Sequence, residues 1–541
     1  SLVLLWDAWN RHTGQPTIFG GAPRPAASAA AAGSTPAGVP GAMASASGGA
    51  ATAPAVATPG AAAAPGERVE LVTDRVKATF DTVGGTLVRL ELLDYRDNAD
   101  RRRNIVLFEH DAQRLYLAQT GLIAAQPGLA LPNHLTPMTV QPGPRTLAAG
   151  AQTLQLRFEG RSAAGVRLAK TYTLERGSYT IGVRHEVFNE GSTPVSPQLY
   201  LQLARDGQPP AGESSFYFTF TGPAVYTEQG KFQKIKFEDI EKGKADFVKQ
   251  ADDGWVAMVQ HYFASAWLLP GHSPREFRVA KVADNQYTVA LVTPLGEVAP
   301  GASKGQDATL FAGPQEEKKL AALAPGLELV KDYGWFTILA KPLFWLLDQL
   351  HKVIGNWGWA IVALVVLLKA AFYWLNASAY RSMAKMKAIN PRVMELRERF
   401  KDEPQKMQQE MMRIYREEKV NPLGSCLPIV VQMPFFIALY WVLLSSVEMR
   451  NAPWIGWITD LADKDPWFIL PILMTVSSLF QVWLNPTPPD PMQAKMMWIM
   501  PLMFSFMFFF FPAGLVLYWL TNNILSIAQQ WFINKRLGVL H

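Results

Sequence analysis

The sequence predicts a multi-domain chain in which an antiparallel β-sandwich precedes a polytopic α-helical membrane domain. Between residues 67 and 325, hydrophobic and polar residues alternate with period two in many short runs, which is typical of half-buried strands. Beyond residue 353, several windows longer than the roughly 20 residues that cross a bilayer contain almost no charge. Only 18% of the 541 residues are charged. The mean hydropathy of +0.04 therefore averages a polar part and an apolar part.

The first 66 residues contain two kinds of segment. We expect residues 1–19 to be the remnant of an N-terminal transmembrane anchor, because the apolar run Ser1–Trp6 stops abruptly at Asp7. The alternative is a short apolar N-terminus without a function. Residues 20–66 consist almost entirely of Ala, Gly, Pro, Ser and Thr. Such a composition lacks the large apolar side chains that offset chain entropy, so it predicts a disordered linker.

Residues 67–325 are predicted to form the β-sandwich. Val69, Leu71 and Thr73 alternate with polar residues, as do Leu154, Leu156 and Phe158, and Gly-rich or Asn-containing turns separate such runs. A short helix over 315–323 would close the domain. Large sandwiches serve as scaffolds that dock partners or as sugar-binding modules; we favour the scaffold.

Residues 326–352 are predicted to contain an interfacial amphipathic helix. From Phe336 to Leu350 the apolar residues share one broad face, whereas Lys341 and Asp348 lie elsewhere. A soluble core helix would have a similar pattern.

Residues 353–541 are predicted to form the membrane-embedded core. No charged residue occurs in 420–447, 466–489 or 496–534, and 353–380 contains a single charge, Lys369. These windows predict spans over about 357–376, 423–444, 467–484 and 500–521. The anchor remnant would be a truncated fifth span.

The loop charges predict the orientation. Residues 381–419 contain 11 Lys or Arg and 7 acidic residues, whereas 448–465 contain 2 basic and 4 acidic residues. The positive-inside rule then places loop 381–419 and the C-terminus in the cytoplasm and the β domain outside. The chain has a single cysteine, Cys426, and a β domain without cysteines suits a bacterial periplasm.

Lys369 is the most informative single residue, because a charge near the centre of a span costs about 2.5–3.5 kcal/mol on insertion scales. One interpretation is an anchor whose long side chain reaches the cytoplasmic interface. The other is a cation that faces a wet cavity between helices, open towards the cytoplasm, and attracts an acidic or hydrated segment.

Residues 381–419 are predicted to form a cytoplasmic helical hairpin. Asn390 and Pro391 would cap and begin one helix, and residues 402–404 would separate it from a second. Met407, Met411, Ile414 and Tyr415 form an apolar stripe on the second helix. This stripe either packs the hairpin or offers an adaptable surface to unfolded apolar segments.

The sequence does not favour an enzyme. It contains no phosphate-binding loop, dinucleotide fingerprint, nucleophile elbow or metal-ligand spacing, so we predict no catalytic residue, metal, cofactor or nucleotide. An alternative function is a channel or small-solute transporter with a periplasmic binding domain. However, no acidic residue lies within a predicted span, which makes a proton relay less plausible.

The C-terminal part resembles the YidC/Oxa/Albino family of membrane protein insertases. The resemblance rests on the following segments: Lys341-Pro-Leu-Phe-Trp-Leu-Leu347, Gly355-Asn-Trp-Gly358, Ser382-Met-Ala-Lys-Met386, Glu418-Lys-Val-Asn-Pro-Leu-Gly424, Gln432-Met-Pro434, Ile469-Leu-Pro-Ile-Leu-Met474, Asp490-Pro-Met492 and Phe511-Pro-Ala-Gly-Leu-Val-Leu-Tyr518. The β domain after its linker is similar to the periplasmic domain of Gram-negative members.

The resemblance implies a five-span insertase and chaperone of the bacterial inner membrane with a hydrophilic groove. The groove cation corresponds to Lys369, where arginine is more usual, and the client-contact residues correspond to Val365, Gln432, Phe436, Met474, Tyr518 and Trp519. The implied partners are nascent membrane proteins, the lipid bilayer, the Sec translocon with its accessory subunits, and the ribosome or the signal-recognition receptor.

Overall fold

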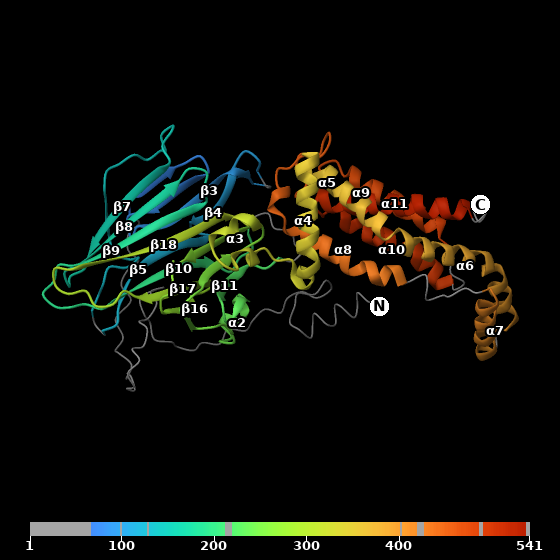
Figure 1. Cartoon of the computed structure of the whole chain (residues 1–541), viewed down its shortest axis with the longest axis horizontal. Helices are drawn as coiled ribbons and strands as arrows, with labels where there is room; N and C mark the ends of the chain where they lie inside the picture. Colours follow the sequence, from blue (N-terminus) through green and yellow to red (C-terminus); the bar gives the residue numbers. More distant parts are fainter. Residues whose placement is uncertain are drawn as a thin grey trace. The chain divides into compact units, whose positions relative to one another are not determined.

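The computed structural model describes residues 66–97, 100–126, 129–210, 219–400, 403–418, 427–485 and 491–536 (Figure 1). The predicted anchor remnant 1–19 and all but the last residue of the predicted linker 20–66 lie outside these residues.

Two nine-stranded sheets form the β domain, and neighbouring strands within them are antiparallel. One sheet has the order β1-β2-β3-β4-β5-β10-β17-β16-β13, and the other has the order β12-β11-β14-β15-β18-β9-β8-β7-β6. The strands are β1 (Arg68–Val72), β2 (Val76–Asp81), β3 (Thr86–Arg96), β4 (Asn104–His110), β5 (Leu115–Ala124), β6 (Thr139–Val140), β7 (Thr153–Arg161), β8 (Val166–Glu175), β9 (Thr180–Asn189), β10 (Pro197–Asp206), β11 (Gly222–Thr227), β12 (Lys231–Lys234), β13 (Gln250–Ala251), β14 (Trp255–Val259), β15 (Phe263–Leu268), β16 (Arg275–Ala283), β17 (Gln286–Pro294) and β18 (Ser303–Pro314).

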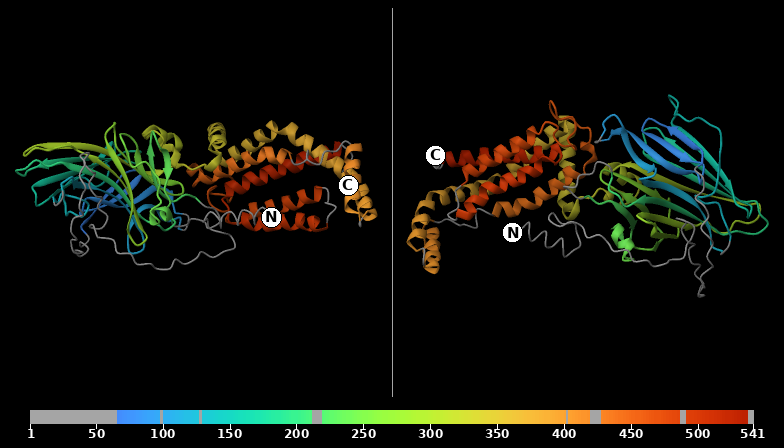
Figure 2. Two further views of the ribbon diagram at one scale, coloured as in Figure 1. Left: turned by 90° about the horizontal axis from the view of Figure 1, so that it is seen from below. Right: turned by 180° about the vertical axis from the view of Figure 1, so that it is seen from behind.

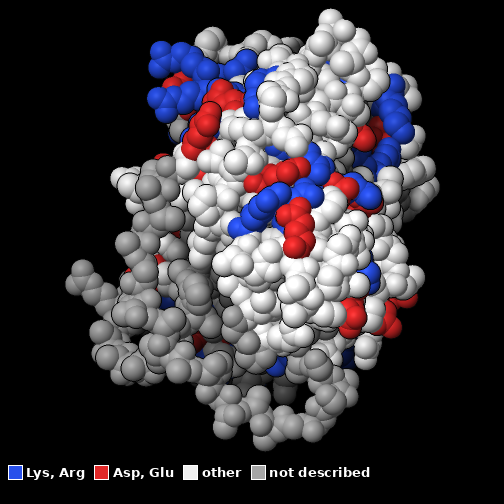
Figure 3. Space-filling view, turned by 90° about the vertical axis from the view of Figure 1, so that its left-hand side faces the viewer, with Lys and Arg blue, Asp and Glu red and all other residues white. Residues whose placement is uncertain are grey.

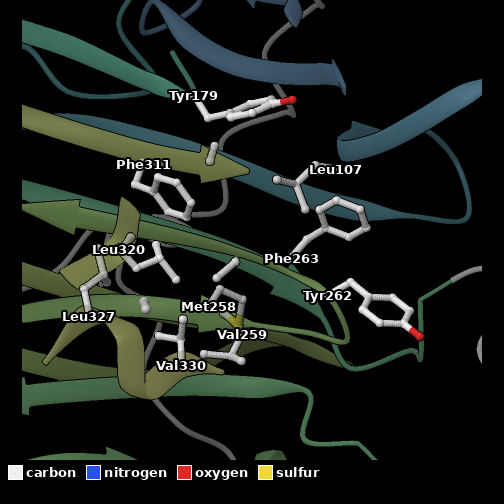
Figure 4. Close-up of a cluster of buried hydrophobic side chains, with 14 of the residues drawn as sticks. Leu107, Tyr179, Met258, Val259, Tyr262, Phe263, Phe311, Leu320, Leu327 and Val330 are labelled. Atoms are coloured by element: carbon white, nitrogen blue, oxygen red, sulfur yellow. The ribbon is translucent and has the colours of Figure 1, made fainter. Parts of the chain in front are cut away.

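The period-two pattern shows which side chains of each half-buried strand face the core of this domain. In β7, Leu154, Leu156 and Phe158 are buried, while Thr153 and Gln155 face solvent, as strand geometry requires. Side chains of β14, β15 and β18 meet Leu320 of helix α3 (Glu317–Leu323) and Leu327 of the 3-10 helix η1 (Leu327–Val330) in the same core (Figure 4). A short helix α2 (Phe237–Glu241) follows β12. The predicted antiparallel β domain is thus confirmed.

The outer surface of the β domain has intermingled charges. On the face shown in Figure 3, basic and acidic side chains lie beside one another in small groups among uncharged residues. On β7, β8 and β9, for example, Arg157 is 2.6 Å from Glu186, and Arg167 is 2.7 Å from Glu190. Paired charges of this kind favour solubility and do not create a field of one sign.

A buried cation joins the two sheets. The Lys170 ammonium of β8 donates to the carbonyls of Gly84 and Thr120 at 2.6 Å each; Thr120 lies on β5 of the opposite sheet, and Gly84 lies in the turn between β2 and β3 of that sheet. His185 of β9 lies 2.9 Å from the hydroxyl of Thr120. Burial lowers the pKa of Lys170 to about 7, and burial together with the Lys170 charge lowers that of His185 to about 3.

The lowered pKa of Lys170 predicts a pH dependence of β-domain stability. Between pH 7 and 10.5 the unfolded chain binds one proton that the folded domain lacks, so stability should rise with pH by about 1 kcal/mol per unit. Lys170→Met should flatten this rise, while the exposed Lys304→Met should leave it unchanged. Thermal unfolding of the purified chain in detergent, followed by β-sheet circular dichroism, measures both slopes. Equal slopes in the three proteins would contradict the prediction.

The helical part begins with α4 (Thr337–Ile354), which matches the predicted amphipathic helix in position. Leu343, Phe344 and Leu347 are buried on one face, whereas Ile338 is 88% and Val353 87% exposed on the other. The helix ends at Gly355, whose φ of +75° suits a residue without Cβ. Asn356 then caps α5 by accepting a hydrogen bond from the backbone N–H of Trp359.

The remaining helices are α5 (Trp357–Ala371), α6 (Tyr373–Arg399), α7 (Pro404–Glu417), α8 (Leu427–Ser445), α9 (Ile469–Leu484), α10 (Pro491–Phe508) and α11 (Ala513–Arg536), with short 3-10 turns η2 (Gly334–Phe336) and η4 (Val447–Met449). Helix α11 packs against α5 and α9, and Figures 1 and 2 show these helices side by side. Within the described residues, no single helix has both the length and the apolarity of a membrane span, but the pair Trp357–Ala371 and Tyr373–Ser382, bent by 66°, has them jointly.

Three predicted helix boundaries are wrong. The chain bends between Ala371 and Tyr373, so the predicted span 357–376 is not one straight helix. The predicted span 500–521 is two helices, because Pro512 cannot donate a backbone hydrogen bond and disfavours the helical conformation at the preceding residue. Conversely, α6 continues through Pro391, where we expected a helix to begin. One proline in a helix costs about 3 kcal/mol, which long flanking helical segments can outweigh. The predicted span 467–484 matches α9, and that at 423–444 matches α8 over the described residues.

Candidate functional site

Helices α5, α8 and α11 line a partly open cavity. Lys369, the single charged residue in the charge-poor sequence windows that predicted the spans, is part of its lining. The cavity holds about 20 Å³ of space that water can occupy, which is enough for a single water molecule. Its lining consists of Val365, Leu368, Lys369, Phe372, Gln432, Phe435, Phe436, Leu439, Tyr518 and Asn522. None of these described residues is acidic, so within the described part of the chain the lining has a positive charge without a carboxylate to balance it.

Lys369 lies in the last turn of α5 and is partly buried. Its ammonium donates to the Ser526 hydroxyl of α11 at 2.6 Å, and that hydroxyl donates to the Asn522 carbonyl at 2.8 Å. A cation and a chain of hydrogen bonds therefore connect α5 to α11 at the cavity.

Polar groups also gather on the α8 side. The Gln432 amide donates to the Asn376 side chain of α6 at 3.0 Å. The Asn376 amide nitrogen and the Tyr518 hydroxyl are buried without a hydrogen-bond partner among the described residues, although their side chains are almost fully enclosed. Buried donors of this kind gain free energy when a polar group reaches them.

One end of the helical bundle is closed by backbone contacts. The Ala513 and Gly514 N–H groups at the start of α11 donate to the carbonyls of Asp463 and Leu461 at 2.7 and 2.9 Å. Asp465 is buried and accepts hydrogen bonds from the backbone N–H groups of Trp467 and Leu470 at the start of α9. The loop after α8 thus fixes the starts of both helices at this end.

Further along, α9 and α11 are joined by hydrogen bonds between side-chain amides and hydroxyls. The Asn523 amide donates to the Ser477 hydroxyl at 2.8 Å, and the Gln530 amide donates to the Asn485 side chain at 3.0 Å. Hydrogen bonds between helices are a usual way of joining them where little water is present.

Family models match nearly all of the described chain. The model for the YidC periplasmic domain matches residues 68–346, and the model for the 60Kd inner membrane protein matches residues 349–538. A membrane protein insertase YidC from Janthinobacterium sp. (strain Marseille) is 53% identical, and the alignment covers 100% of this chain and 98% of that protein. The chain belongs to the YidC family of membrane protein insertases.

A second sequence relative agrees with this family membership. A membrane protein insertase YidC from Cupriavidus taiwanensis is 57% identical over 99% of this chain and 96% of that protein. A crystal structure described as an active YidC insertase with its first transmembrane domain resolved is 18% identical, covers 85% of this chain and 91% of that chain, and has a TM-score of 0.38. The YidC family is one of bacterial inner-membrane proteins, and the resemblance stated from the sequence is confirmed.

The cavity brings together five of the seven groove residues that the resemblance implies. Val365, Lys369, Gln432, Phe436 and Tyr518 line it, and the rings of Phe436 and Tyr518 lie 6.2 Å apart.

Two of the implied groove residues are not part of the lining. Trp519 packs among aromatic rings, with Phe508 at 5.1 Å and Phe511 at 5.6 Å between centroids. Met474 lies on α9, where its carbonyl accepts from Ser477. Two polar groups next to the cavity, Ser526 and Asn376, were not predicted. Their contact partners are 157 and 56 residues away in the sequence, so no local pattern indicates them.

The described residues of the predicted hairpin form the last part of α6 and all of α7, and Figures 1 and 2 show α7 turned away from the other helices. Arg392 of α6 lies 2.8 Å from Glu418, which follows α7, and this ion pair joins the two helices. The predicted stripe residues Met407, Met411, Ile414 and Tyr415 are all partly buried. Their spacing places them on one face of α7.

Proposed function

We propose that this protein inserts integral membrane proteins into the bacterial inner membrane and helps them to fold, and that the cavity beside Lys369 receives the polar end of the client. The observation that carries this proposal is the ammonium of Lys369, which lies among apolar helices without a carboxylate in the cavity lining. Acidic or hydrated client segments would be attracted to such a cation. Family membership supports the insertase activity itself.

The drive for insertion would come from the client. The hydrogen-bond donors at the cavity, among them Lys369 and Gln432, would lower the cost of moving a short polar tail part of the way across, because they replace some of the tail's water. Burial of the client's apolar span in lipid then releases roughly 25 cal/mol for each Å² removed from water. A nucleotide is not needed for this process.

The helix order supports a revised membrane topology. Four spans after the β domain would return the C-terminus to the side of that domain, which conflicts with the basic C-terminal residues Lys535 and Arg536. Counting α10 and α11 separately gives five crossings: the α5–α6 pair, α8, α9, α10 and α11. The C-terminus and the hairpin then both face the cytoplasm. Contacts of residues 461–463 with the start of α11 agree with a common periplasmic end.

Several partners follow from this arrangement. The β domain on the periplasmic side is suited to dock other components, and we propose accessory subunits of the Sec translocon. On the cytoplasmic side, the hairpin and the basic tail are suited to the ribosome or the signal-recognition receptor, because ribosomal RNA has an anionic surface.

Reconstitution tests the proposed function directly. The purified chain in liposomes should insert a single-span client with a short acidic tail, and the tail should become protected from protease added outside. Liposomes without the protein, or with the Lys369→Glu variant, are the controls. Equal protection in all three would exclude the insertase function for that client.

The hairpin provides a second prediction. Deletion of residues 392–419 should abolish client protection in the same assay, because the stripe of Met407, Met411, Ile414 and Tyr415 would no longer meet the client. A matched variant with Met407 and Met411 changed to Ser keeps both helices and should lose several-fold in activity. Normal protection in the deletion would leave the stripe with a packing role only.

A further inference from the structure

A lysine at this position has two places where its ammonium can lie. The side chain is long and flexible, so it can extend towards the cytoplasmic interface or remain at the cavity. In the structure the ammonium is at the cavity, where the hydroxyl of Ser526 accepts its hydrogen bond at 2.6 Å.

The Ser526 hydroxyl is itself held in place. It is buried on α11 and donates its own hydrogen to the Asn522 carbonyl one turn earlier at 2.8 Å. With its hydrogen engaged in this way, the oxygen presents its lone pairs to Lys369 and to the Tyr380 hydroxyl of α6, which is also hydrogen-bonded to Ser526. Asn522 lines the cavity, so the acceptor lies at its edge.

We propose that Ser526 is a positioning residue for client insertion, which holds the ammonium of Lys369 at the groove cavity. The inference rests on the proposed groove function of Lys369 and adds what fixes the cation there. A lysine needs such an acceptor because its point charge has no planar fork that would define its direction. Ser526 touches Lys369 and acts through it, without contacting the client.

The test compares Ser526→Ala with Ser526→Thr in the liposome assay, each with Lys369 or with Lys369→Met. A hydrogen bond to a charged group contributes enough to change a rate about tenfold when it is lost. With Lys369 present, Ser526→Ala should therefore reduce insertion of an acidic-tailed client about tenfold, and Ser526→Thr should restore most of it. In the Lys369→Met background, Ser526→Ala should have no further effect.

Ser505→Ala is the matched control. Ser505 is also buried, and its hydroxyl donates to the carbonyl of Pro501, four residues earlier, at 2.6 Å, but it lies on α10, whereas Ser526 lies on α11 and accepts the hydrogen bond from Lys369. This variant should insert clients at the normal rate.

The outcomes separate the two proposals. If Lys369→Met reduces insertion but Ser526→Ala does not, the positioning role is wrong and the groove cation stands. An equal loss from Ser526→Ala with and without Lys369 would also overturn the positioning role, because a general packing defect does not depend on the cation. Full activity of Lys369→Met would overturn the groove cation and this inference together.

Discussion

Replacement of Lys369 by Glu is expected to reduce insertion of clients with acidic translocated segments by at least about tenfold, whereas Lys369→Arg should keep most of the activity. Two unit charges about 4 Å apart near a protein surface interact with about 4 kcal/mol, and Glu turns this attraction into repulsion. Arginine keeps the charge although its planar fork differs in geometry. Growth of a strain depleted of its own insertase, complemented with each variant, measures the effect together with the liposome assay.

A neutral substitution and a neutral client make this comparison sharp. Lys369→Met is the neutral control, and clients with uncharged tails should be less affected by all three variants. Full growth with Glu would show that the sign of the charge is irrelevant and would leave Lys369 as an interfacial anchor.

The β domain could be predicted in outline because its strands are half-buried. Alternation at Leu154, Leu156 and Phe158 gives the period and the inner face directly. The pairing could not be predicted, since β5 lies beside β10 and β9 beside β18, far apart in the sequence. Strands buried along their whole length, such as β10, have no alternation that would reveal them.

The helical part was predicted from the absence of charge, and this signal does not locate helix ends. Residues 496–534 form one charge-free window but two helices, because the break at Pro512 depends on contacts with Asp463 and Leu461. In the topology that we propose, the extra helix changes the side of the membrane on which the C-terminus lies. Proline alone is not a reliable signal, because Pro391 lies inside α6.

Lys369 was identifiable from the sequence because a single charge in an apolar window is costly. The residues that surround Lys369 could not be identified from the sequence. Ser526 and Asn376 look like ordinary small polar residues in apolar helices, and only the packing of α11 against α5 and of α8 against α6 brings them to the cavity.

A buried ion pair fixes the end of α8, the helix that supplies Gln432 and Phe436 to the cavity. The Lys331 ammonium, which follows η1, lies 3.1 Å from both carboxylate oxygens of Glu448 in η4. The Lys331 side chain is 0% exposed and that of Glu448 is 20% exposed. The same ammonium lies 3.7 Å from the centre of the Phe344 ring of α4. One cation from the segment after η1 therefore contacts both η4 and α4.

Breaking this pair from either side should be destabilising, but to different extents. Glu448→Leu leaves the enclosed Lys331 without its counter-charge, which costs about 3–5 kcal/mol in comparable buried pairs. Lys331→Met leaves a carboxylate that still reaches water, so the loss should be smaller. The double variant Lys331→Met with Glu448→Leu removes both charges and should recover much of the stability. Thermal unfolding of the full chain in detergent measures this double-mutant cycle. Additive losses would mean that the two side chains do not act as a pair.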